Sequence, residues 1–170
     1  MKICVCVKQV PDPLATIRVA SDARSIDEGT VTWSVNPYDE IGIEAALQLR
    51  DQHPGSQVTL VTLGSIRAEA VLRSGLALGA DHAVRIHAGT DLSPMGVAGT
   101  LAEYFKQNPF DLIICGKQAI DDDAGVVGPA LAELLNARFG PGELGQASAI
   151  IKDEQRCIRC ALCVERCPVG

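Results

Sequence analysis

The last fourteen residues, CIRCALCVERCPVG, contain four cysteines at a spacing that suits an iron–sulfur cluster. Cys157, Cys160, Cys163 and Cys167 form the pattern C-x2-C-x2-C-x3-C-P. Thiolates at this spacing hold a [4Fe–4S] cluster, with the fourth cysteine usually serving a second cluster. Zinc ribbons use two separated C-x2-C pairs and thioredoxin-like sites use a single pair, so both fit less well. We therefore predict that these four cysteines bind a [4Fe–4S] cluster.

The number of cysteines in this run does not decide whether it can hold a complete cluster. Only three of the four thiols normally serve the same cluster. The other cysteines of the chain, Cys4, Cys6 and Cys115, lie in short apolar segments, where cysteine usually behaves as a small apolar residue. A ferredoxin would continue with a second run at the point where this sequence stops. The chain is thus either a truncated or fused fragment with a non-functional cluster site, or it carries a cluster that is incomplete as written.

A second stretch suited to binding is GKQAIDDDAGVVGPALAELL, residues 116–135. Gly116 leaves room for a ligand, Gly125 loosens the turn, and Pro129 fits the first turn of a helix. The amides of residues 125–128 would then lie at a helix N-terminus, where anions bind. Three consecutive aspartates would repel phosphate, so we expect one to bind ribose hydroxyls and another to cap the helix. A helix-capping turn with a solvated acidic face fits the pattern equally well.

The composition narrows the class of protein. Of the 170 residues, 47% are apolar and 21% are charged, which fits a globular chain. The net charge of −6 and the absence of a basic block argue against nucleic-acid binding. The N-terminus lacks the apolar region and cleavage site of a signal peptide, and no apolar stretch is long enough for a membrane span. We therefore expect a cytoplasmic protein whose seven cysteines are metal ligands or buried residues rather than disulfides.

Alternating strands and helices must position these stretches. Short β-branched runs with near-continuous apolarity predict strands buried on both faces, and they occupy residues 2–7, 57–63, 82–86 and 111–115. Helical patterns lie between them, after Asn36-Pro37, from Ser65 to Gly79 with Ala68, Val71, Leu72 and Leu76 on one face, and after Ser93-Pro94. This alternation predicts an α/β fold with a doubly wound, mostly parallel, Rossmann-like sheet. Residues 16–33 interrupt it and predict a hairpin lying off the main sheet.

A change of character marks a domain boundary near residue 140. NARFGPGELGQ, which follows Leu135, has three glycines and a proline and so resembles a linker. ASAIIKDEQRC then resembles the strand and turn that lead into a ferredoxin's first cysteine. We predict a nucleotide-binding domain at 1–139, a linker at 140–146 and a small ferredoxin-like segment at 147–170.

Four motifs together resemble the β subunit of electron transfer flavoproteins over about residues 1–136. They are VKQVPD, NPYDEIGIEAALQL, LALGADHAVRI and GKQAIDDDAGVVGPALAELL, in the family's order and spacing. The resemblance implies that a nucleotide lies over the strand ends, AMP in many members and FAD in electron-bifurcating ones. It assigns the contacts to Cys6, Asn36, Pro37, Tyr38, Asp39, Leu63, Gly116, Lys117, Gln118, Ala119, Ile120, Asp121, Asp122, Asp123, Ala124, Gly125, Val126 and Val127.

The resemblance also implies a partner, an electron transfer flavoprotein α subunit that holds most of the redox FAD in a heterodimer. A dehydrogenase or a ferredoxin would be the electron partner. Two departures stand out. Val126 replaces a glutamine of many relatives, which weakens the phosphate site, and the cysteine run replaces the C-terminal arm that embraces the α subunit, which puts the pairing in question.

These observations predict an electron carrier rather than an enzyme, unless the chain belongs to a bifurcating oxidoreductase complex. The alternative is a nucleotide-binding regulatory domain whose cluster senses redox state. An ATP-using enzyme is disfavoured because the sequence has no G-x-x-x-x-G-K-[ST] loop.

Overall fold

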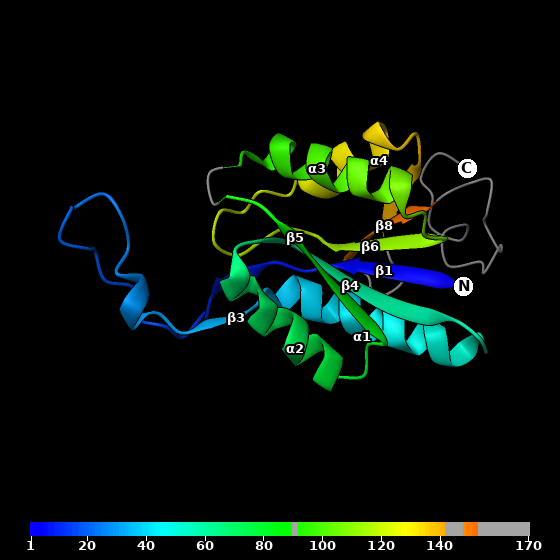
Figure 1. Cartoon of the computed structure of the whole chain (residues 1–170), viewed down its shortest axis with the longest axis horizontal. Coiled ribbons are helices and arrows are strands. Elements are labelled where there is room, and N and C mark those ends of the chain that lie inside the picture. Colours follow the sequence, from blue (N-terminus) through cyan, green and yellow to red (C-terminus); the bar gives the residue numbers. More distant parts are fainter. Residues whose placement is uncertain (90–91, 142–147, 153–170) are drawn as a thin grey trace.

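The fold is a six-stranded sheet between two layers of helices (Figure 1). The computed structural model describes residues 1–89, 92–141 and 148–152. The strand order is β5-β4-β1-β6-β8-β7, and the first four strands of this order are parallel. Their bounds are β1 Lys2–Cys6, β4 Gln57–Gly64, β5 His82–His87, β6 Leu112–Gly116, β7 Arg138–Pro141 and β8 Ser148–Lys152. The predicted α/β class with a mostly parallel sheet is confirmed.

The central strands are buried on both faces, as their unbroken apolar runs predict. Ile3, Cys4 and Val5 of β1 are completely buried, and alternate side chains contribute to two separate cores. One core lies against α1 (Pro37–Gln52) and α2 (Glu69–Ala77), and the other lies against α3 (Pro94–Gln107) and α4 (Val127–Leu134). Figure 1 shows these two helical layers on opposite faces of the sheet. Burial of both faces holds the strand ends in fixed positions.

Two details of the helices differ from the sequence expectations. A 3-10 turn, η2 (Ile66–Ala68), precedes α2, and the Ser65 hydroxyl makes no capping hydrogen bond. Leu76 is 39% exposed, whereas Gly75 is buried and packs so closely on Leu60 that a β-carbon would not fit. The apolar face of α2 is therefore rotated away from Leu76. Ser93 does cap α3 as its Ser-Pro pattern predicts, because its hydroxyl accepts the Gly96 amide at 3.2 Å.

A hairpin does lie off the main sheet, but apart from Trp33 its strands lie outside residues 16–33. β2 (Gln9–Pro11) pairs antiparallel with β3 (Trp33–Val35), so the strands flank the interrupting segment. Residues 12–32, here called the arm, contain one β-bridge between Val19 and Ile26 and the 3-10 turn η1 (Glu28–Thr30). Figure 1 shows the arm projecting well beyond the sheet. Polar turn chemistry such as the Asp22 turn, which accepts the Arg24 and Ser25 amides, replaces longer strand pairing.

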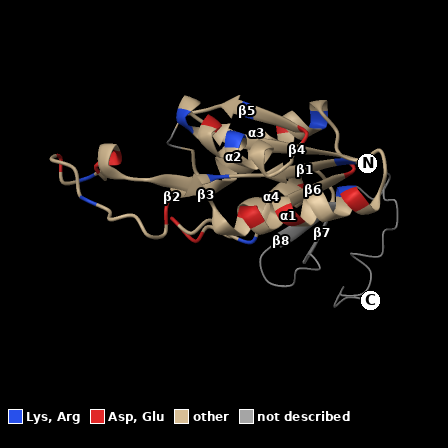
Figure 2. Cartoon of the chain, turned by 90° about the horizontal axis from the view of Figure 1, so that it is seen from below, with Lys and Arg blue, Asp and Glu red and all other residues tan. Residues whose placement is uncertain are grey.

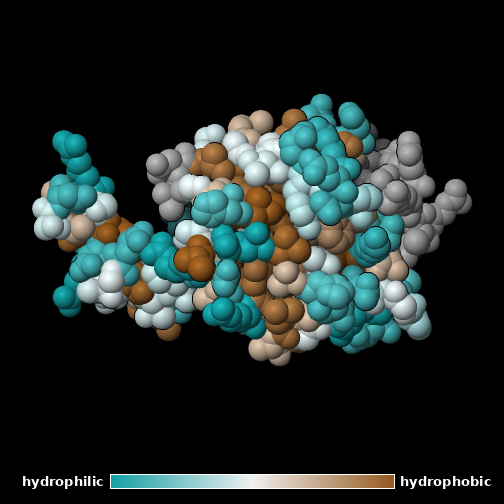
Figure 3. Space-filling model, in the orientation of Figure 1, coloured by the Kyte–Doolittle hydropathy of each residue, from teal (hydrophilic) through white to brown (hydrophobic). Residues whose placement is uncertain are grey.

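The sheet continues beyond the boundary that the sequence predicts near residue 140. β8 pairs antiparallel with β6, and β7 pairs with β8. Residues 148–152, expected to begin a ferredoxin-like segment, are therefore a strand of the main sheet. Pairing with β8 satisfies the backbone groups of β6, which would otherwise form an open edge. At the other edge, β5 is half-buried, and Figure 3 shows an apolar strip between α2 and α3 in this region.

Charged residues fall mainly on the helices, the arm and the loops rather than in the centre of the sheet (Figure 2). Within residues 1–89 and 92–137, Asp39 is the one acidic or basic side chain that is buried. Every helix of the described residues is too short or too polar to cross a membrane. A buried carboxylate needs polar partners nearby, and Asp39 therefore requires hydrogen-bond donors around the first turn of α1.

Candidate nucleotide-binding site

A cavity of about 480 Å³ lies at the carboxyl ends of the parallel strands. The chain runs from β1 to β4 and β5 on one side, and then returns to β6 on the other side of β1. The loops after β1 and β6 therefore diverge, which leaves a crevice where ligands bind in open α/β sheets. Cys6, Leu63 and Gly116 line the cavity from the ends of β1, β4 and β6. Its volume is within the range of roughly 300–1,000 Å³ typical of small-molecule sites.

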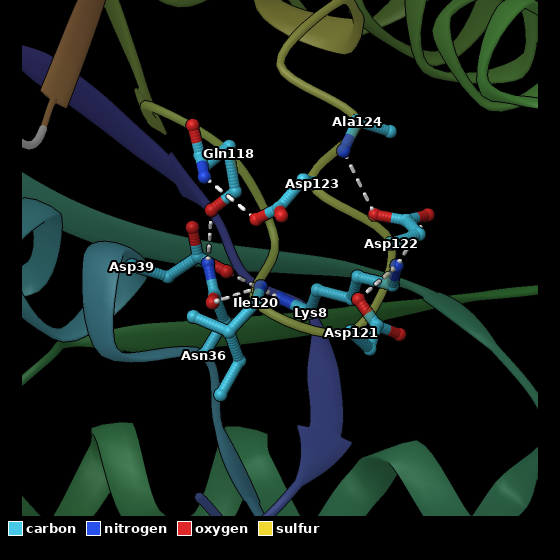
Figure 4. A network of polar contacts seen from close by, with 9 residues as sticks. All are labelled: Lys8, Asn36, Asp39, Gln118, Ile120, Asp121, Asp122, Asp123 and Ala124. Atoms are coloured by element: carbon cyan, nitrogen blue, oxygen red, sulfur yellow. Dashed lines mark hydrogen bonds and ion pairs between the residues drawn. The ribbon is translucent and has the colours of Figure 1, made fainter.

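Asn36 joins three segments around this cavity. Its side chain is 1% exposed. The Asn36 Nδ2 group donates to the carbonyl of Gln118 at 2.9 Å, and its Oδ1 accepts the amide of Ile120 at 3.2 Å (Figure 4). Its own amide donates to the carbonyl of Lys8 at 3.0 Å. Asn36 occupies the cap position of α1, yet its side chain caps no helical amide, since the β6–α4 loop uses it instead.

Asp39 lies beneath the same loop, in the first turn of α1. Its carboxylate accepts the Lys8 amide at 2.8 Å, and polar contacts with the Gly116 amide and the Asn36 side chain also act to lower its pKa. Burial nevertheless raises the pKa of Asp39 to about 7, because desolvation outweighs these hydrogen bonds. A β-carbon at position 116 would overlap Asp39 Oδ1 and crowd Tyr38. Gly116 is thus required by Asp39, a reason that differs from the expected contact with a ligand.

Lys8 crosses the rim of the cavity to the aspartate run. Its Nζ donates to Asp121 Oδ1 at 2.8 Å and to Asp122 Oδ2 at 3.1 Å (Figure 4). Burial acts to lower the pKa of Lys8, but the two carboxylates outweigh it and raise that pKa. All three side chains are partly exposed, so each pair contributes little to stability. The contacts place one cation and two anions at the cavity wall.

The loop before α4 is stabilised differently from the expectation. Asp122 Oδ1 accepts the Ala124 amide at 3.0 Å, and the Gly125 amide donates to the carbonyl of Asp123 at 2.8 Å. The residue at the cap position is Val126, so the prediction that an aspartate caps this helix is wrong. Asp123 adopts a positive φ of 52° and accepts Gln118 Nε2 at 2.7 Å. The Gly125 amide is already engaged, while Val127 and Gly128 line the cavity at the start of α4.

Three thiols lie near the floor of the cavity. Cys6 and Cys115 are register partners on β1 and β6, and both line the cavity. Cys4 and Cys115 are buried, as predicted for apolar strand residues, and Cys6 is half-buried. The hydrogen bond with Cys115 acts to lower the pKa of Cys6, but Cys4 and burial raise it well above its usual value. The hydrogen bond with Cys6, followed by burial, also raises the pKa of Cys115. Both thiols therefore stay protonated and form an apolar floor.

Most residues assigned by the family resemblance line this cavity. Those that do so are Cys6, Asn36, Asp39, Leu63, Gly116, Lys117, Gln118, Ala119, Asp121, Asp122, Ala124, Gly125 and Val127. Pro37, Tyr38, Ile120, Asp123 and Val126 do not line it. Ile120 and Asp123 support the loop instead, through Asn36 and Gln118. Whether any of these residues contacts a nucleotide remains a prediction.

The cavity also includes residues that the sequence does not mark as site residues. Glu28, Trp33 and Arg67 line its mouth. Glu28 lies in the arm, which looks like an irregular insertion, and Arg67 follows the end of β4 by three residues. Trp33 is the first residue of β3. Only the position of Arg67 after a strand end offered a signal, because the rim of a parallel sheet collects such residues.

The four cysteines of the predicted cluster, Cys157 to Cys167, lie outside the described residues. Within residues 1–89, 92–141 and 148–152, no group of three or more histidine, cysteine, aspartate or glutamate side chains is placed to hold a metal ion. The cluster thus depends on the sequence pattern alone.

Comparison with known proteins agrees with both parts of the sequence. Residues 24–140 match the electron transfer flavoprotein domain family, and residues 150–170 match the 4Fe-4S binding domain family. The electron transfer flavoprotein subunit beta of Bradyrhizobium diazoefficiens is 39% identical over 135 residues, covering 79% of this chain and 54% of the relative. The same subunit of Megasphaera elsdenii is 40% identical over 143 residues, covering 78% and 52%.

Protein FixA of Azorhizobium caulinodans is 44% identical over 142 residues, covering 79% of this chain and 50% of the relative. The chain thus spans about half the length of the curated relatives it matches.

Proposed function

Because the chain belongs to the electron transfer flavoprotein domain family, we propose that it is a β-type electron-transfer subunit that binds AMP or FAD in the cavity at the strand ends. The observation that carries this proposal is the network of Asn36 and Asp39, which fixes the β6–α4 loop around the cavity. A network of this kind holds a ligand-binding loop in one geometry before the ligand arrives.

The residues around the cavity fit an adenine nucleotide. Cys6, Val61 and Cys115 form an apolar wall suited to a base. The carboxylates of Asp121 and Asp122 are acceptors for ribose hydroxyls, and Lys8 lies beside them to offset their charge. In this arrangement the protein binds and orients the nucleotide. The cofactors supply the redox chemistry, and the protein supplies their separation and electrostatic environment.

We further propose that Cys157, Cys160, Cys163 and Cys167 hold a [4Fe–4S] cluster that relays single electrons. The partner would be an electron transfer flavoprotein α subunit in a heterodimer, with a dehydrogenase or a ferredoxin beyond it. The chain would then act in the cytoplasm as a carrier rather than as an enzyme. The names of the relatives and the two family matches support this assignment.

The first test is anaerobic purification of the whole chain, followed by its visible spectrum, iron analysis and identification of released nucleotide. A broad iron–sulfur band, about four irons per chain and released AMP or FAD support the proposal. Released FAD supports a two-cofactor relay, and AMP supports a structural nucleotide beside a cluster. Iron without any nucleotide overturns nucleotide binding, both for the carrier and for its redox-sensing alternative. A colourless protein that releases only AMP overturns the cluster and leaves a nucleotide-binding fragment.

A further inference from the structure

Arg67 is held at the mouth of the cavity by two side chains from the hairpin and the arm. Its Nη1 donates to Glu28 Oε2 at 2.6 Å, and its Nη2 donates to Glu28 Oε1 at 3.3 Å. Its guanidinium carbon lies 4.3 Å from the centroid of the Trp33 ring. The Arg67 carbonyl accepts the side chain of Gln9 at 3.1 Å, which fixes the backbone as well. All four residues line the same cavity.

This arrangement leaves the charge of Arg67 available to a ligand. The Arg67 side chain is 38% exposed and that of Glu28 is 53% exposed, and an ion pair of this exposure contributes little to stability. Stacking on Trp33 fixes the plane of the guanidinium without using its N–H groups. A phosphate presents the same paired acceptor oxygens as the Glu28 carboxylate and carries more charge. Exchange of one for the other therefore requires no large movement of the arginine.

Arg67 also differs from the other cation that is paired at the cavity wall. Lys8 is shared between two carboxylates from the same loop. Arg67 is paired with one carboxylate only, and that carboxylate belongs to the arm, which projects away from the main sheet (Figure 1). The Glu28 carboxylate is thus the easier of the two partners to displace.

We infer that Arg67 is a further anion-binding residue of this cavity, which exchanges the Glu28 carboxylate for a phosphate of the bound nucleotide while remaining stacked on Trp33. The inference rests on the proposed binding of an adenine nucleotide. It assigns Glu28 the role of an internal competitor, so removal of its charge strengthens the binding of a phosphate-bearing ligand. The same exchange releases the arm from η2.

The test compares AMP with adenosine, which has the same base and ribose but no phosphate. Affinities are measured by isothermal titration calorimetry on the whole chain freed of nucleotide. R67M weakens AMP binding by about tenfold or more and leaves adenosine unchanged, because a charge-assisted pair of hydrogen bonds to phosphate is lost. E28Q strengthens AMP binding several-fold. R73M is the matched control, since Arg73 pairs with Glu69 on the exposed face of α2.

Trp33 supplies an independent readout because it is the single tryptophan of the chain. Its emission changes on AMP binding and does not change with adenosine. The inference is overturned if R67M and E28Q bind AMP as the wild-type chain does, and the arginine is then a structural contact of the arm. That result leaves the proposed function intact. A wild-type chain that binds neither AMP nor adenosine overturns both.

Discussion

Asp39 Oδ1 occupies the space that a β-carbon at position 116 would need. The pair joins the first turn of α1 to the end of β6, and the carboxylate accepts the amide of Lys8 there. A buried acid and a glycine thus depend on each other, since a larger residue at position 116 would overlap the carboxylate and a smaller residue at position 39 would leave an empty space. Their contact fixes the position, relative to the cavity, of the loop that follows β6.

G116A tests this dependence directly. The added methyl group forces Asp39 or the loop to move, and we expect a loss of about 1–3 kcal/mol in the free energy of unfolding, together with weaker nucleotide binding. Urea denaturation measures the first effect and calorimetry with AMP measures the second. G99A is the matched control, because nothing lies within 4 Å of a β-carbon at Gly99 of α3. Helix propensity predicts that G99A is stabilising by about 0.5–1 kcal/mol. Equal behaviour of the two variants would contradict the close approach.

The raised pKa of Asp39 predicts that stability depends on pH. The pKa is about 7 in the folded chain and about 3.9 when unfolded, so between these values the folded state binds more protons. The contribution is complete below about pH 4 and is lost as the pH rises to about 7, with a slope of up to about 1.4 kcal/mol per pH unit.

The measurement is urea denaturation at pH 5, 6, 7 and 8 for the wild-type chain, D39N and D51N. D39N removes this part of the slope because asparagine does not titrate. D51N is the control on the same helix, since the Asp51 side chain is 70% exposed. The assignment fails if the wild-type and D39N curves remain parallel across this range.

Substitution of Asn36 is expected to lower both the stability of the fold and the order of the β6–α4 loop. N36A removes hydrogen bonds to Gln118 and Ile120 and leaves their partly buried backbone groups without this partner. We expect a loss of about 2–4 kcal/mol in the free energy of unfolding. Hydrogen exchange should show faster exchange of the Ile120 amide. N108A is the control, because the Asn108 side chain makes one exposed hydrogen bond, to the Tyr104 carbonyl. A cost no larger than that of N108A would show that the loop holds itself in place.

The thiol floor predicts a pattern of chemical labelling. Cys6 is half-buried and lines the cavity, whereas Cys4 is buried. The raised pKa of Cys6 makes its alkylation slow at neutral pH, because the thiolate is the reactive form. Peptide mass mapping after iodoacetamide treatment should show partial labelling of Cys6, less labelling of Cys4, and protection of Cys6 by AMP. Labelling of Cys6 that AMP does not reduce would place the ligand elsewhere.

Much of this architecture follows from the sequence because strand burial leaves a direct trace in it. Ile3, Cys4 and Val5 are consecutive apolar residues, which only a strand covered on both faces requires. The alternation of such strands with helices determines the α/β class and predicts a ligand cavity at the strand ends. The pattern of four cysteines likewise identifies a cluster motif without any knowledge of the fold.

Other features depend on pairings between distant residues, which leave no local pattern. The sequence of β8 resembles the beginning of a ferredoxin, yet its backbone groups pair with β6 of the main sheet. The sequence predicts that Gly116 leaves space for a ligand, yet Asp39, 77 positions earlier in the chain, fills that space. Arg67 reads as one exposed arginine among others until the tertiary structure brings Glu28 and Trp33 to it. Local sequence determines which segments are buried, but only the three-dimensional packing decides which polar groups meet at the rim.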